Sequence, residues 1–357
     1  MLASLALSAA ALTVAGFKCE RLGPANAPVV IGVELPLAGD DGFRGLAARD
    51  GVRFALKRWN ERNVRKAAAL LCDSATHVQN PHADEGSDDP AQAANAAVLV
   101  RAFAAESSVV AVVGGLRSDI AASEAPVAQR ASLALLSAST TPVRGAATFF
   151  RAGHSDEAEA AEASSLAARA HFGVPTLRSR DAARASAMRA VFGTATNSGA
   201  TLFAGPAGVG SILAGAAQSE ALERENILDR MDRRGFAYPL TMGAAFSIAP
   251  AAGIEPQSLQ RYQRSIIAAY GGPALDDTFA YDDAMTLALS ASNDRAGHAT
   301  PSRAAVVRTL EKNAFTTLHG RIRFTRTRAA DRAWYAVRSL ADAKAATRIE
   351  CVKLRSE

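Results

Sequence analysis

The side chains best suited to chemistry are short hydroxyls that follow apolar runs near the middle of the chain. Ser118 follows the apolar run 109–113 and a pair of glycines, and a hydroxyl cluster, Ser139, Thr140 and Thr141, follows the next apolar run. Hydroxyls beside the backbone N–H groups of a helix start stabilise an anion without a counter-charge. The pattern indicates ligand recognition and predicts no catalytic residue.

A strand–helix–strand unit is expected to position these hydroxyls. The β-branched run 109–113 ends on Gly114-Gly115, which predicts a strand buried on both faces. Residues 118–130 have the period of a helix, and residues 133–136 form a second short apolar strand. Such a unit pairs its strands in parallel, with a right-handed crossover. Both strands therefore end at one edge of the sheet, where open α/β sheets bind small ligands.

Apolar strands and amphipathic helices alternate along the rest of the chain. Strands are predicted at 28–36, 67–71, 201–204, 212–214, 238–242, 319–324, 334–337 and 348–352. Helices are predicted at 47–60, 90–103, 156–172, 182–196, 219–234, 257–270, 278–291 and 300–312. Residues 176–181 carry two arginines, so they form either an edge strand or no strand.

Composition and motifs exclude several functional classes. The 357 residues have room for two ordinary domains, and 49% hydrophobic with 21% charged residues is globular. The net charge is +5, but no basic run is interleaved with aromatics, which argues against a nucleic-acid partner. There is no nucleophile elbow or Walker loop, and the glycines at 205–210 lack the dinucleotide fingerprint. We expect neither an enzyme nor a cofactor.

A metal site was weighed in the polar segment 72–89. It holds Cys72, His77 and His82, with four residues between each and the next. That spacing in a loop matches no compact ligand pattern, so no metal site is predicted.

The N-terminal region resembles an export signal. Residues 2–17 are uncharged and mostly apolar, like a signal-peptide core without its cationic start, and cleavage is expected after Ala15. Cys19 raises the alternative of a lipid anchor, but Gly16-Phe17-Lys18 does not fit the motif that precedes a lipidated cysteine. A Cys72–Cys351 disulfide is one alternative, and buried or free thiols are preferred.

Several blocks together resemble the type I periplasmic solute-binding proteins of ABC importers, the leucine/isoleucine/valine-binding-protein family. They are residues 29–62, 87–103, 109–142, 149–161, 279–291 and 318–327, in the order of the family. The resemblance implies an α/β fold with two Rossmann-like lobes, parallel sheets and a multi-strand hinge. It implies lobe 1 at 26–150 plus 252–325 and lobe 2 at 151–251 plus 326–357, after an N-terminal segment 1–25.

The resemblance also assigns the ligand-binding residues. The loop Gly114–Ser118, with Arg117, matches the loop that holds one end of the ligand, and Ser118 matches the residue that binds a ligand carboxylate. Ser139, Thr140 and Thr141 match the second binding loop. Arg44 matches a cleft position that is commonly aromatic in the family, where a cation would favour an anionic ligand. The alternatives are a solvated loop charge for Arg44 and an ordinary helix N-cap for Ser118.

The second lobe departs from the family. One helix–strand unit is missing between Ala204 and Ile212, so the lobe is expected to be reduced. Where amino-acid binders of the family place an acid for the ammonium group, this chain has Ala244-Ala245. A free α-amino acid is therefore a poorer candidate ligand than a simple carboxylate, an amide or an aromatic acid.

The predicted function is solute binding for an ABC importer of the branched-chain-amino-acid type. The predicted partners are a small solute and an inner-membrane permease, and the protein is expected to be a periplasmic monomer. The alternative is a sensor or accessory protein that kept the fold without transport.

Overall fold

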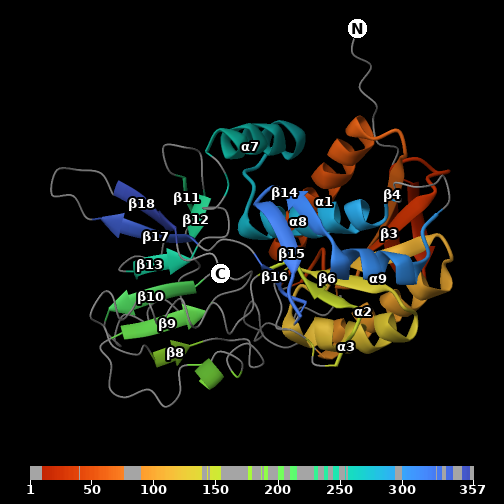
Figure 1. The fold of residues 1–357 in the computed structure, drawn as a ribbon, viewed down its shortest axis with the longest axis horizontal. Helices are drawn as coiled ribbons and strands as arrows, with labels where there is room; N and C mark the ends of the chain where they lie inside the picture. The colour runs from red at the N-terminus through yellow and green to blue at the C-terminus, as the bar shows by residue number, and fades with distance from the viewer. Residues whose placement is uncertain are drawn as a thin grey trace, which may run out of the picture.

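The computed structural model describes most of the first lobe and the strands of the second. The described residues are 10–39, 41–75, 90–138, 143, 145–153, 176–178, 186, 189–191, 200–204, 210–214, 229–231, 237–239, 244–248, 254, 256–293, 300–326, 328–331, 335–340 and 348–353. Figure 1 shows these strands gathered into two separate main sheets.

The first sheet has seven strands in the order β1-β2-β4-β3-β5-β6-β7. They span Ala10–Val14, Phe17–Leu22, Ala67–Asp73, Val29–Leu35, Val109–Val113, Ala134–Ser137 and Phe149–Arg151. The pairs from β4 through β7 are all parallel, whereas β1 and β2 form an antiparallel hairpin along β4. Every residue of β3 and β5 is buried, as expected of parallel strands covered on both faces.

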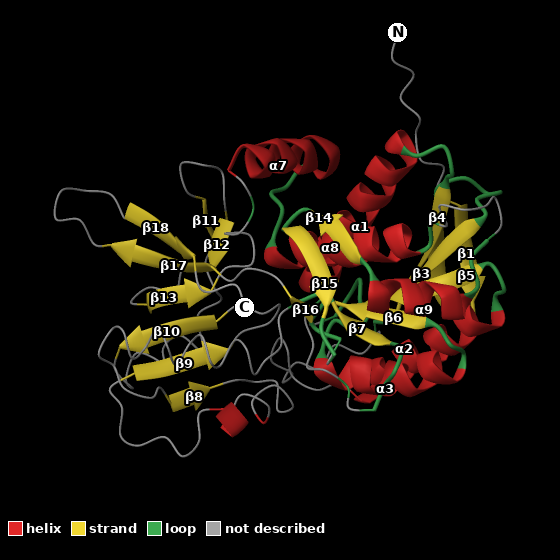
Figure 2. Ribbon diagram, in the orientation of Figure 1, coloured by secondary structure: helices red, strands yellow, loops and turns green. Residues whose placement is uncertain are grey.

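Helices cover both faces of this sheet (Figure 2). They are α1 (Gly42–Arg62), α2 (Pro90–Ala105), α3 (Ser118–Arg130), α8 (Asp276–Ala291) and α9 (Arg303–Lys312). Neighbouring residues of β3 enter different cores: Ile31 packs with residues of α1, α8 and α9, and Val30 packs with residues of α2 and α3. α7 (Pro256–Tyr270) adds a smaller core against Phe54 of α1 and Phe279 of α8. None of these described helices is long and apolar enough to cross a membrane.

Glycines set the position of α1. A Cβ atom on Gly51 would lie 2.1 Å from the carbonyl oxygen of Thr278, so only glycine lets α1 approach α8 this closely. A Cβ atom on Gly45 would lie 1.6 Å from the carbonyl oxygen of Pro36. The turn after β3 therefore folds directly against the first turn of α1.

The second sheet has the order β18-β17-β13-β10-β9-β8. Its strands span Arg348–Lys353, Tyr335–Leu340, Ala244–Ile248, Gly210–Ala214, Ala200–Ala204 and Thr176–Arg178. A separate pair, β11 (Asp229–Met231) with β12 (Ala237–Pro239), is antiparallel. β8 occupies an edge, as one of the two alternatives for 176–181 predicts, whereas β13 was not predicted as a strand.

The predicted α/β fold with two lobes is confirmed, but the parallel pairing expected of both sheets is wrong for the second. Only β8 and β9 pair in parallel there, and the other four pairs are antiparallel. The reason lies between β9 and β10, which only residues 205–209 separate. A parallel connection needs a dozen or more residues, so this short one closes a hairpin. The missing helix–strand unit thus explains why β9 and β10 pair antiparallel and not in parallel.

The N-terminal segment departs from the prediction. Residues 10–22, expected within a separate segment 1–25, supply β1 and β2 of the first sheet. Cleavage after Ala15 would fall in the turn between them and stays a prediction. Cys19 lies opposite Cys72 across β2 and β4, and the two form a disulfide. Of the preferred alternatives, buried or free thiols, burial holds for Cys19 and Cys72, but neither thiol is free, and the Cys72–Cys351 alternative is wrong. The sulfur of Cys19 is bonded to Cys72 and so does not carry the lipid of the alternative prediction.

A three-stranded sheet completes the first lobe. It contains β14 (Ala314–Thr317), β15 (Gly320–Phe324) and β16 (Ala330–Asp331), all antiparallel. Ala329 also pairs with Arg151 at the end of β7. Four residues after the end of β16 the chain enters β17 of the second sheet, so this contact lies beside a connection between the lobes.

Candidate functional site

The candidate site lies where β3, β5 and β6 end. Because these strands run in parallel, the loops that follow them meet at one edge of the sheet. The Gly114-Gly115 turn is fixed from three sides. The Ser137 hydroxyl donates to the carbonyl of Gly115 (2.8 Å), the Tyr281 hydroxyl donates to the carbonyl of Gly114 (3.2 Å), and the N–H of Gly115 donates to Glu34 (3.3 Å).

Ser118 is the first residue of α3 and is buried at this edge. Arg117, with extended backbone, occupies the N-cap position, so the alternative of Ser118 as the N-cap is wrong by one residue. The first N–H groups of a helix have no partner within the helix and attract negative charge. The start of α3 therefore has the chemistry of the predicted carboxylate site.

Arg117 points into the protein and pairs with two acids. Its guanidinium forms a two-point ion pair with Asp119 (3.0 and 2.8 Å) and a second, short one with Asp41. Burial opposes the charged form, but the bonds to Asp119 and Asp41 outweigh it and raise the pKa of Arg117.

Arg44 is also buried, so the alternative prediction that it is a solvated loop charge is wrong. Its Nε and Nη2 atoms lie 3.1 and 3.3 Å from the carboxylate oxygens of Asp277, which is 233 residues away in sequence. Its Nη1 atom lies 3.7 Å from Asp41. Burial is again outweighed by these carboxylates, and the pKa of Arg44 is raised.

Three aspartates and two arginines thus form one buried ion-pair network. Its members alternate in sign in the order Asp277, Arg44, Asp41, Arg117, Asp119. A ligand carboxylate could reach either guanidinium only by displacing an aspartate. The network is thus built to hold the loops after β3 and β5 against the start of α8.

A second pair of acids lies under the Gly114-Gly115 turn. Glu34 of β3 and Glu124 of α3 are fully buried, and a Cβ atom on Gly114 would lie 3.0 Å from a carboxylate oxygen of each. Burial raises the pKa of Glu34, and burial together with the charge of Glu34 raises the pKa of Glu124 well above its usual range. Two carboxylates in contact cannot both ionise at low cost, so the pair shares a proton.

Two predicted segments fall largely outside the part of the chain that the structure describes. Ser139, Thr140 and Thr141 lie outside the described residues, as do residues 76–89 of the weighed metal loop. Across the described part of the chain, no three His, Cys, Asp or Glu side chains cluster as metal ligands. Asp282 serves a structural role, since its carboxylate binds Arg58 (2.6 Å) and the hydroxyl of Tyr262 (3.0 Å).

Sequence reasoning missed Glu34, Asp41, Glu124, Asp277 and Phe43. Glu34 had a signal, because it is the only charged residue in an otherwise apolar strand. Phe43, in the first turn of α1, is 64% exposed and is an aromatic ring beside the position assigned to Arg44. Nothing local distinguishes Asp277 from other helix-start acids.

Comparison with known proteins gives structural neighbours only. No protein-family model matches the chain, and no curated protein matches it significantly. LivJ, a branched-chain amino acid transporter substrate-binding protein from Streptococcus pneumoniae solved with isoleucine, aligns with a TM-score of 0.63 at 15% identity, over 91% of this chain and 99% of LivJ.

Two neighbours were solved with aromatic acids. A solute-binding protein from Rhodopseudomonas palustris with 3,4-dihydroxybenzoic acid has a TM-score of 0.64 at 13% identity, over 91% of this chain and 96% of the neighbour. Another from R. palustris, with benzoate, has a TM-score of 0.60 at 12% identity, over 91% and 95%. At these identities the likeness establishes the fold. The chain therefore has the fold of the type I periplasmic substrate-binding proteins of ABC transporters, the LivJ/LivK type.

Proposed function

We propose that this protein is the solute-binding component of an ABC importer, which captures a small carboxylate between its lobes and presents it to a permease. The observation that carries the proposal is the structural match to solute-binding proteins over 91% of the chain. No residue in the described part of the site forms a catalytic constellation, which favours recognition over bond chemistry.

The substrate class follows from the chemistry of the site. Isoleucine, 3,4-dihydroxybenzoate and benzoate, the ligands of three neighbours, all carry a carboxylate. In this chain Arg44 and Arg117 already bind aspartates, so the N–H groups at the start of α3 and the Ser118 hydroxyl would donate hydrogen bonds to the carboxylate. The predicted second loop, Ser139 to Thr141, would supply further hydroxyls.

An aromatic carboxylate fits better than an α-amino acid. Phe43 offers an exposed ring at the start of α1, on the strand edge where the ligand is expected. The sequence places alanines at 244 and 245, where an ammonium group would need an acid.

The Cys19–Cys72 disulfide supports export independently of the fold. Disulfides persist in oxidising compartments such as the bacterial periplasm and are rare in the cytosol. A periplasmic monomer is therefore part of the proposal.

The test is a thermal-shift screen of the purified chain against benzoate, 3,4-dihydroxybenzoate and isoleucine. A ligand at 100 times its Kd should stabilise the protein by about 2.7 kcal/mol, with the aromatic acids binding more tightly than isoleucine. Phe43→Ala should weaken aromatic binding, whereas Val64→Ala, which is 99% exposed just beyond the other end of α1, should not.

Absence of stabilisation by any carboxylate would contradict the proposed substrate class. If a broad solute library also fails, the sensor or accessory alternative, which the reduced second lobe favours, takes its place.

A further inference from the structure

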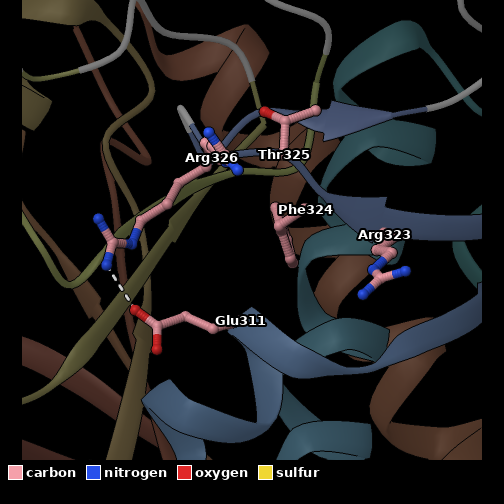
Figure 3. A pocket seen from close by; sticks show the side chains of 6 residues that line it. Glu311, Arg323, Phe324, Thr325 and Arg326 are labelled. Carbon is pink, nitrogen blue, oxygen red and sulfur yellow. Dashed lines mark hydrogen bonds and ion pairs between the residues drawn. The ribbon is translucent and has the colours of Figure 1, made fainter. Parts of the chain in front are cut away.

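A pocket of about 520 Å³ lies beside the connection between the lobes, and its lining shares no residue with the predicted solute site. Its lining comes from the end of α9 and from the turn between β15 and β16: Glu311, Arg323, Phe324, Thr325, Arg326 and Arg328. Figure 3 shows Glu311 on one side of the pocket and Thr325 with Arg326 on the other. None of these residues belongs to the Arg44–Arg117 network.

The six residues that line the pocket carry a net positive charge. Arg328 pairs with Glu311 at 2.5 Å. Arg323 and Arg326 are exposed and have no polar partner within the described part of the chain. Three arginines against one glutamate leave an excess of two positive charges around one cavity.

The turn that carries these arginines is held in place. The N–H of Thr325 donates to the carbonyl of Ala329 (2.9 Å), and the N–H of Arg328 donates back to the carbonyl of Thr325 (2.9 Å). Arg328 adopts a left-handed backbone conformation (φ 59°), which is costly for a side chain of this size. Its guanidinium lies 5.6 Å from the centre of the Phe150 ring, and Phe150 packs edge-on against Phe324. The arginines are thus presented from a rigid frame.

That frame belongs to the hinge region. The N–H of Arg151, at the end of β7, donates to the carbonyl of Arg328 (2.8 Å), and β17 of the second sheet begins four residues after Asp331. A ligand that joins Arg326 to Arg323 would therefore bind next to the last connection between the lobes.

We propose that this pocket binds a small dianionic oxyanion, such as a phosphate monoester or a dicarboxylate, through residues that the predicted solute site does not use. Two free guanidinium groups can bind such oxyanions at two points each, and Phe324 gives the cavity an apolar wall. The excess of two positive charges matches a dianion better than a monoanion.

The test measures binding of inorganic phosphate and of succinate to the full chain by calorimetry, at constant ionic strength because exposed charges are screened by salt. The double variant Arg323→Gln/Arg326→Gln should weaken binding about tenfold or more, since each lost bond is charge-assisted. Both side chains are exposed, so folding should be unaffected.

The matched control is Arg321→Gln, on the same strand and also exposed but outside the pocket. It should leave the Kd unchanged within about twofold. Vesicles with and without phosphatidic acid, whose headgroup is a phosphate monoester, distinguish a lipid headgroup from a free oxyanion as the source of the ligand. Loss of binding to either source only in the pocket variant supports the site. No binding of any probe, or equal losses in the pocket and control variants, would overturn it.

Discussion

At the scale of single residues, the arginines assigned to the ligand act first on the protein. Arg44 and Arg117 each have a carboxylate within hydrogen-bond distance, and Asp41 joins them. The sequence offers both guanidinium groups as anion sites, but it does not indicate which acids lie beside them. Charge type was predictable, whereas the pairing partner was not.

The Arg44–Asp277 pair gives the first prediction. Asp277→Asn leaves a buried guanidinium without its main counter-charge, which should lower the free energy of unfolding by about 3–5 kcal/mol. Asp50→Asn is the control, because its pair with Arg49 is partly exposed and worth about 0–1 kcal/mol. Urea unfolding of both variants measures the difference, and equal losses would show that Arg44 does not depend on Asp277.

The Glu34–Glu124 pair predicts a pH dependence. Both folded-state pKa values are raised, so the folded state holds more protons than the unfolded state above about pH 4.5. Stability should therefore fall as pH rises from about 4.5 through the raised pKa of Glu124. Glu124→Gln keeps a hydrogen-bond donor and removes the titration, so it should flatten this fall. Unfolding curves between acid and alkaline pH measure it, and an unchanged slope in the variant would refute the assignment.

At the scale of elements, the close approach of two helices can outweigh the intrinsic helix propensity of a residue between them. Gly51 lies inside α1, where glycine is intrinsically a poor helix former. Propensity alone predicts that alanine would stabilise this position by about 0.5–1 kcal/mol. The contact of α1 with α8 predicts instead that alanine at position 51 would destabilise the protein.

Gly51→Ala should therefore destabilise the protein by about 1–3 kcal/mol, because its Cβ atom would meet the backbone oxygen of Thr278. Gly42→Ala is the control on the same helix, since its nearest contact would be an ordinary 3.5 Å. Urea denaturation compares the two variants. A stabilised Gly51→Ala protein would mean that α1 and α8 are not this close.

The Cys19–Cys72 bond gives a prediction for the sheet edge. It closes a loop with a sequence separation of 53 residues, and removing such a bond costs about 2–4 kcal/mol. A Cys19→Ala/Cys72→Ala double variant should melt at a lower temperature, and a reducing agent should lower the Tm of the wild-type protein in the same way. Cys351→Ala should keep the sensitivity to reduction, and a loss of that sensitivity would indicate a different pairing.

At the scale of the whole molecule, two lobes joined by several connections predict closure on the solute. A ligand that contacts both lobes only in the closed state shifts the population toward that state. The radius of gyration measured by small-angle X-ray scattering should fall when a solute identified in the thermal screen saturates the protein. A non-binding solute at the same concentration serves as the control. Binding with an unchanged radius would contradict closure.

The strands and helices of the first lobe could be predicted because their signals are local. Apolar runs marked β3 and β5, the second of them ending on Gly114-Gly115, and the helical period marked α3 at its observed ends. Similarly, the short connection between Ala204 and Ile212 marked the second lobe as reduced. It did not show that the remaining strands would pair mainly antiparallel.

The sequence by itself determined the α/β class, the order of the first-lobe elements and the edge at which Ser118 lies, because periodicity and strand ends depend on neighbouring residues. Tertiary structure alone decided that Arg44 pairs with Asp277, that Glu34 meets Glu124, and that Cys19 joins Cys72. These pairs are distant in sequence, and only the packing of sheet and helices brings them within bonding distance. It also places the arginines of the hinge pocket around one cavity, where along the chain they are merely basic residues in a turn.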